Sequence, residues 1–110
     1  MPDTIVRAVF AELQASAGAD FVVELVDTFF EEAPQMIADL RAALAAGAAE
    51  RFRRAAHSLK TNANTFGATA LGAQARELEL GGLPPDATGI DVLQSLFDAT
   101  VPALRELARG

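Results

Sequence analysis

Residues 53–71 read R-R-A-A-H-S-L-K-T-N-A-N-T-F-G-A-T-A-L and contain His57, the only histidine of the 110-residue chain. Apolar residues recur through this stretch at steps of three and four positions, the spacing of a helix that buries one face. They are Ala56, Leu59, Ala63 and Phe66, and Phe52, just before the stretch, continues the same spacing. The stretch therefore predicts a packed helix over about 48–64, followed by a break at Phe66-Gly67.

A second face of the same helix carries polar groups. Lys60, Thr61 and Asn64 follow His57 by three, four and seven positions, so these side chains share a face with the imidazole. Arg53 lies one turn before His57 and adds a second cation. The face is a candidate functional surface, but an alternative stays open, because a lone histidine and flanking charges on a helix are often simply solvated.

The composition predicts one globular all-α domain over residues 1–110. Hydrophobic residues make up 51% of the chain, and strong β-formers are sparse. The net charge of −6, with scattered basic residues, disfavours nucleic acid as a partner. Without cysteine there is no disulfide or thiolate site. No signal peptide is recognisable, and no apolar run approaches the roughly 20 residues that span a bilayer. We therefore expect a cytoplasmic protein that does not bind membranes.

The remaining apolar runs predict four more helices around a loop rich in Gly and Pro at 81–89. Their expected ranges are about 2–16, 20–46, 68–80 and 90–108. Short connections between amphipathic helices are typical of an antiparallel up-down four-helix bundle, here with a short additional N-terminal helix. Stripes of buried residues are expected on every helix.

Several local features refine this expectation. Pro2 and Asp3 suit the first turn of the N-terminal helix. Asp20 is the expected N-cap of the long helix, Gly47 its C-terminal stop, and Pro34 a kink that leaves it continuous. In the last helix Pro102 should act likewise. Glu77 and Glu79 are expected to face outward from the fourth helix.

Several kinds of site that use a histidine can be excluded or disfavoured for His57 from the sequence. Metal sites with nitrogen or sulfur ligands need partners that the chain lacks, although a site of carboxylates alone stays open. No nucleophile elbow indicates a serine triad, and no GxxxxGK[ST] loop indicates ATP binding. An exposed imidazole could still act as a nucleophile toward a group carried by another protein. A neighbouring ammonium such as Lys60 would then offset phosphoryl charge.

The segments H-S-L-K at 57–60 and F-G-A at 66–68, followed by Leu71, closely resemble the signature of histidine-containing phosphotransfer (HPt) domains. The family pattern is H-x-L-K-G, a short spacer, an aromatic or aliphatic residue with Gly, and an apolar residue four positions later. The segment F-F-E-E-A-P at 29–34 is also similar to the family. The resemblance covers about residues 15–108. Thr61 departs from it, because the family most often has Gly there.

The resemblance implies a phosphorelay intermediate. His57 would accept a phosphoryl group from the aspartyl phosphate of one receiver domain and pass it to an aspartate of another. Lys60 would contact the phosphoryl oxygens, with Thr61 and Asn64 as further stabilising groups. Arg53 and Gly67 would support the site, Gly67 by allowing the turn after the histidine helix.

The resemblance also implies partners and cofactors. The expected partners are response-regulator receiver domains and a hybrid histidine kinase. The family's Mg²⁺ belongs to the receiver, so no cofactor is expected on this chain. Without an ATP-binding or kinase domain, the chain is expected not to be an enzyme on its own, and we expect a monomer.

The sequence also suggests a surface for docking a receiver domain, and it leaves two alternative functions to consider. Phe30, with Val23 and Ile37, lies on the flank of the long helix's apolar stripe and could meet a receiver, unless all three belong to the core. The alternative function is a helical interaction module that kept the fold and lost phosphotransfer, a reading that Thr61 keeps open. An unrelated helical-bundle enzyme is disfavoured, because no second catalytic group is visible near His57.

Overall fold

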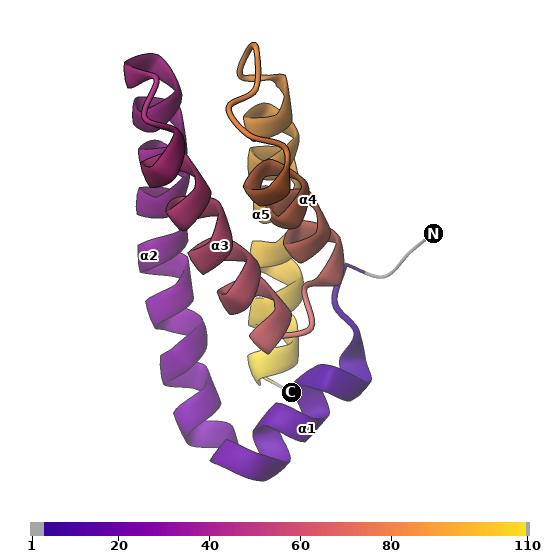
Figure 1. Ribbon diagram of the computed structural model, residues 1–110. Helices are drawn as coiled ribbons and strands as arrows, with labels where there is room; N and C mark the ends of the chain where they lie inside the picture. Colours follow the sequence, from indigo (N-terminus) through magenta and orange to yellow (C-terminus); the bar gives the residue numbers. More distant parts are fainter. Residues whose placement is uncertain (1–3, 110) are drawn as a thin grey trace.

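A computed structural model describes residues 4–109 and shows five α-helices in this range and no strand (Figure 1). The helices are α1 (Arg7–Ala17), α2 (Ala19–Ala46), α3 (Ala49–Thr65), α4 (Thr69–Leu80) and α5 (Thr88–Arg109). The predicted all-α class is confirmed, and the four long periodic segments begin and end within two residues of their expected bounds.

The longest helix, α2, runs through Pro34 without a break, so the prediction of one continuous helix is confirmed. It ends as expected at Gly47, whose φ of 66° lies in the left-handed region where glycine carries no steric penalty. The predicted cap at its start was wrong. The N-cap is Gly18, and Asp20 instead lies in the first turn, where its negative charge faces the positive end of the helix.

The N-terminal segment is held by a backbone contact across the chain. Pro2 and Asp3, predicted to open the first helix, lie outside the described residues. Within them, α1 begins at Arg7, later than expected. Just before it, the Val6 N–H donates to the Gly67 carbonyl at 2.8 Å, which ties this segment to the turn between α3 and α4.

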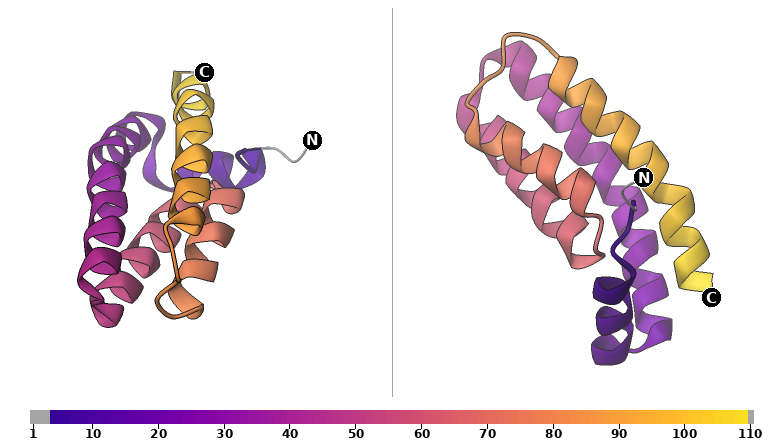
Figure 2. Two further views of the ribbon diagram at one scale, coloured as in Figure 1. Left: turned by 90° about the horizontal axis from the view of Figure 1, so that it is seen from above. Right: turned by 90° about the vertical axis from the view of Figure 1, so that its right-hand side faces the viewer.

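The helices α2, α3, α4 and α5 enclose a common core. The helix α3 packs against α2 and α4, and α5 packs against the same two, while α1 packs against α2 and, less extensively, α3. Figure 2 shows α1 crossing the end of the bundle where α2 begins. The core therefore lies mainly between these four helices, and α1 adds the buried Phe10 to it.

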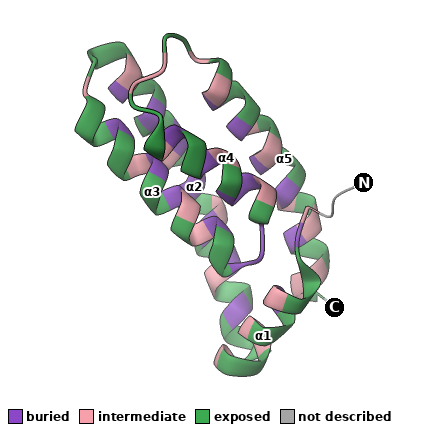
Figure 3. Cartoon of the chain, turned by 45° about the vertical axis from the view of Figure 1, so that its right-hand side comes forward, coloured by how far each residue is buried: buried purple, intermediate pink, exposed green. Residues whose placement is uncertain are grey.

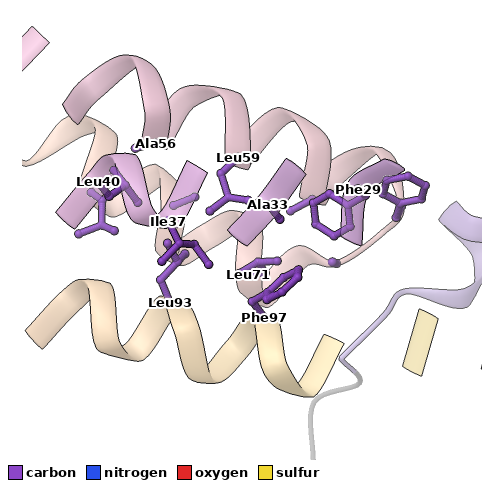
Figure 4. Packing of buried hydrophobic residues seen from close by; sticks show 14 of the residues in the cluster. Phe29, Ala33, Ile37, Leu40, Ala56, Leu59, Leu71, Leu93 and Phe97 are labelled. Atoms are coloured by element: carbon purple, nitrogen blue, oxygen red, sulfur yellow. The ribbon is translucent and has the colours of Figure 1, made fainter. Parts of the chain in front are cut away.

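The core is apolar and continuous along the bundle (Figure 4). The Phe29 ring packs against two other aromatic rings, with its centroid 5.2 Å from that of Phe66 and 5.8 Å from that of Phe97. Thr100 is a buried polar residue, and its hydroxyl donates to the Leu96 carbonyl at 2.7 Å. Burial alternates with exposure along each helix, as amphipathic packing requires (Figure 3). None of the described helices combines the length and apolar character needed to cross a bilayer.

Candidate functional site

The His57 ring lies on α3 where this helix faces α4. Its Nδ1 atom is 2.7 Å from Oε2 of Glu79, and the His57 side chain is 55% exposed while that of Glu79 is only 9% exposed. The outward orientation predicted for Glu79 was therefore wrong, whereas Glu77 is exposed as expected. The site joins one exposed ring to one nearly buried carboxylate.

The packing of α4 on α3 explains the position of Glu79. Glu79 follows Gly72 by seven positions and Ala75 by four, and both are buried on the face that meets α3. A Cβ built on Gly72 would lie 2.1 Å from Oδ1 of Asn64 in α3, so the two helices approach closely there. Because Glu79 continues this face, its carboxylate is directed at α3 and not at solvent.

The contact with Glu79 assigns the tautomer of His57. An ionised carboxylate can only accept hydrogen bonds, so the proton must be on Nδ1 and be donated to Oε2. In the neutral ring the other nitrogen, Nε2, then carries an unshared electron pair. The half-exposed ring therefore offers one unprotonated nitrogen to a molecule that approaches α3.

Lys60 binds the same carboxylate. Its Nζ atom is 2.7 Å from Oε1 of Glu79, and its side chain is 24% exposed. Oε1 is shielded from solvent and has no aligned hydrogen-bond donor among the described residues, so the nearby ammonium compensates its charge. Lys60 first and His57 second lower the pKa of Glu79, although burial of this carboxyl acts in the opposite direction. Glu79 is thus ionised near neutral pH and bridges the two predicted site residues.

Arg53 is paired with a carboxylate one turn earlier in α3. Its guanidinium donates from Nε and Nη2 to the two carboxylate oxygens of Glu50, at 3.2 and 2.5 Å. This pairing raises the pKa of Arg53 and lowers that of Glu50. The negative charge of Glu79 also raises the pKa of Arg53, after the larger effect of Glu50.

Thr61 and Asn64 are both exposed on α3, and the hydrogen bond of His57 described above goes to Glu79 and not to either of them. The backbone carbonyl of Thr61 accepts a hydrogen bond from the Thr65 hydroxyl, at 2.9 Å. Asn64 lies over Gly72, and seven residues of helix separate it from His57 by about 10 Å along the axis. The structure therefore brings His57, Lys60 and Glu79 together and leaves Asn64 outside this group.

Gly67 forms the turn predicted between α3 and α4. Its φ is 79°, and a Cβ there would lie 2.7 Å from the Val6 carbonyl oxygen. Only glycine fits both the left-handed backbone and this approach. Gly67 thus sets the direction in which α4 leaves α3, and with it the position of Glu79.

The residues predicted for docking are not gathered near His57. Ile37 is 2% exposed, so its predicted docking role was wrong and it belongs to the core. Val23 and the half-buried Phe30 line a groove between α2 and α5, where the Arg105 guanidinium lies 5.3 Å above the Phe30 ring. This groove opens between two helices other than the one that carries His57.

No group of three or more carboxylate or imidazole side chains within residues 4–109 is placed to hold a metal ion. The polar atoms around His57 instead form a chain of Lys60, Glu79 and His57. An imidazole with one anchored nitrogen and one free nitrogen is suited to nucleophilic attack on an electrophile supplied from outside.

Comparisons with known proteins found a matching family model and a similar solved structure. The family model of the Hpt domain matches residues 24–106. The crystal structure of histidine-containing phosphotransfer protein B (HptB) from Pseudomonas aeruginosa PAO1 is similar, with a TM-score of 0.76 and 28% sequence identity. The match covers 99% of this chain and 94% of that chain. No curated protein matches the chain significantly in sequence.

Proposed function

Because this chain belongs to the Hpt domain family, the histidine phosphotransfer proteins of phosphorelays, we propose that His57 is the residue that carries the phosphoryl group. The observation that supports this most strongly is the 2.7 Å contact between His57 Nδ1 and Glu79. The contact fixes the ring and leaves Nε2 free on the exposed side of α3. No other imidazole exists in the chain.

The proposed step balances as a displacement at phosphorus. The electron pair of Nε2 forms the new N–P bond, and the bond between phosphorus and the aspartyl oxygen of the donor breaks. The donor aspartate leaves as a carboxylate. The Nδ1 proton stays in its hydrogen bond, so the positive charge that develops on the ring lies beside the carboxylate of Glu79. The reverse step, onto the aspartate of a second receiver, uses the same contacts.

Lys60 is proposed to bind the phosphoryl oxygens. Its ammonium is already beside the ring, where Glu79 holds it. Phosphoryl transfer depends mainly on positioning and charge neutralisation, which an oriented lysine supplies. Thr61 is exposed on the same helix face, and we assign its hydroxyl an auxiliary contact with the phosphoryl group.

Membership of the family also bears on the domain organisation and the partners of the protein. Hpt proteins are phosphotransfer intermediates without kinase domains. We propose that residues 1–110 form one antiparallel up-down bundle capped by α1, as the ring of helix contacts supports. We further propose that it acts in the cytoplasm as a monomer, exchanging phosphoryl groups with receiver domains and a hybrid histidine kinase. The Mg²⁺ of the reaction would belong to the receiver.

The test is transfer of labelled phosphate. The protein is incubated with receiver domains that carry an aspartyl [³²P]phosphate, and the label on this chain is examined for acid lability and base stability, the signature of phosphohistidine. Wild type should be labelled and His57→Gln should not, with the same melting temperature for both. Absence of label on wild type with every receiver of the source organism would reject phosphotransfer in favour of an interaction module.

A further inference from the structure

A groove beside His57 is lined by residues of both α2 and α3. It has a volume of about 290 Å³ and is lined by Met36, Asp39, Arg51, Arg54, Ala55 and Ser58. Ser58 follows His57 in α3, and Arg54 precedes it by three positions, so the groove lies beside the same turns of α3 that carry His57. A protein that covers His57 from outside therefore reaches this groove within one turn of α3.

The groove combines an apolar floor with a cationic rim. Met36 and Ala55 are half-buried and packed against the core, which leaves part of each side chain open to the groove. On the rim, Arg51 Nη2 is bound to Asp39 Oδ1 at 2.7 Å, so these two charges largely offset each other. The remaining cation is Arg54.

Arg54 is available to a partner. Its side chain is 71% exposed, and its Nε atom is 4.0 Å from a Glu50 oxygen that already accepts a shorter bond from Arg53. Arg54 precedes His57 by three positions, so the two residues are neighbours on the surface of α3. In a chain with a net charge of −6, this is a local cationic edge beside the site.

We propose that the groove between α2 and α3 docks an apolar side chain of the receiver, and that Arg54 selects receivers with a carboxylate beside it. The inference rests on the proposed function, because a receiver must bring an anionic aspartyl phosphate to His57. Arg54 complements the charge of that anionic partner surface. Arginines also line the groove on the α2–α5 side, where Phe30 lies, but the α2–α3 groove is favoured because it is lined by the helix that carries His57. Arg54 acts on binding and does not touch the reacting atoms.

The test compares two charge reversals of equal size. Arg54→Glu changes the groove, and Arg105→Glu makes the same change on the α2–α5 side. Each variant receives phosphate from one receiver domain that labels wild type, and the KM for that receiver and its dependence on salt are measured. Phosphoramidate, a small phosphoryl donor that needs no docking, reports the reactivity of His57 separately.

We expect Arg54→Glu to raise the KM about tenfold, to weaken its salt dependence, and to leave labelling by phosphoramidate within about twofold of wild type. Arg105→Glu should match wild type in its KM for the receiver, in the salt dependence of that KM and in its labelling by phosphoramidate. Equal KM values for wild type and Arg54→Glu would overturn the docking proposal alone, as would a raised KM in Arg105→Glu only. If no receiver labels wild type, the proposed function itself fails and the docking proposal falls with it.

Discussion

At the scale of single residues, Glu79 controls which nitrogen of His57 is free. A carboxylate beside Nδ1 selects the tautomer with an unprotonated Nε2 and stabilises the ring after it gains positive charge. Lys60 is oriented by the same carboxylate. The roles of Glu79 and Lys60 can be tested separately, by substituting Glu79, by varying the pH and by substituting Lys60.

Glu79→Gln should slow phosphorylation of His57 on the order of tenfold. The amide keeps the shape of the side chain but no longer requires the proton on Nδ1, and it carries no charge to stabilise the product. The measurement is the initial rate of labelling by phosphoramidate. Glu77→Gln is the matched control, because it removes an exposed carboxylate from the same helix. Equal rates in both variants would show that the Glu79 contact has no part in the reaction.

The contribution of Glu79 to stability should depend on pH. Its pKa is lowered in the folded protein, mainly by Lys60, so ionisation of this carboxylate favours the folded state. The contribution is fully present above the pKa in the unfolded chain and is lost as pH falls through the folded value. The difference in free energy of unfolding between wild type and Glu79→Gln should therefore be largest near neutral pH and shrink in acid. Urea unfolding at several pH values measures it, and a constant difference would contradict this assignment.

Lys60→Ala should shorten the lifetime of phosphohistidine several-fold, because no ammonium then neutralises the phosphoryl oxygens. It should also lower the melting temperature, since Oε1 of Glu79 loses its cation. The double variant Lys60→Ala/Glu79→Gln should recover stability but not the lifetime. Lys60→Arg, which keeps the charge, should retain most of the lifetime. If Lys60→Ala leaves the lifetime unchanged, Lys60 only balances Glu79.

At the scale of elements, the turn between α3 and α4 decides whether the site is assembled. Gly67→Ala forces a side chain into left-handed backbone and against the Val6 carbonyl, so it should lower the free energy of unfolding by about 2 kcal/mol or more. Gly82→Ala is the control, because Gly82 has a similar φ of 73° but nothing within 4 Å of the added Cβ. Urea unfolding should therefore show the larger loss for Gly67→Ala. Equal losses would mean that the contact with Val6 is unimportant.

The periodicity of the sequence predicted the elements well, because each long helix buries one clear apolar stripe. It did not predict which residue of α4 would lie opposite His57, since spacing within a helix says nothing about its register against a neighbour. A signal was nevertheless present. Gly72, Ala75 and Glu79 are spaced as one face, and two small residues on a face indicate close packing of the next helix.

At the scale of the whole molecule, the site lies outside the core that holds the bundle together. The core residues come mainly from the helices α2 to α5, with Phe10 added by α1, whereas His57 and Lys60 project from the outer part of α3. The sequence predicted His57 and Lys60 because they lie in a local motif. It wrongly included the buried Ile37 among the candidate docking residues, because a stripe within one helix cannot show how far the neighbouring helices cover its edge.

The central claim is that Nε2 of His57 carries the phosphoryl group while Nδ1 remains bound to Glu79. Because the chain has one histidine, ¹⁵N labelling of histidine gives the ring signals of a single residue. The most direct measurement is ¹⁵N and ³¹P NMR of the protein after phosphorylation by a receiver. We predict phosphorus bonded to Nε2 and a protonated Nδ1. Phosphorus on Nδ1, or a labelled protein whose histidine nitrogens are unchanged, would contradict the account.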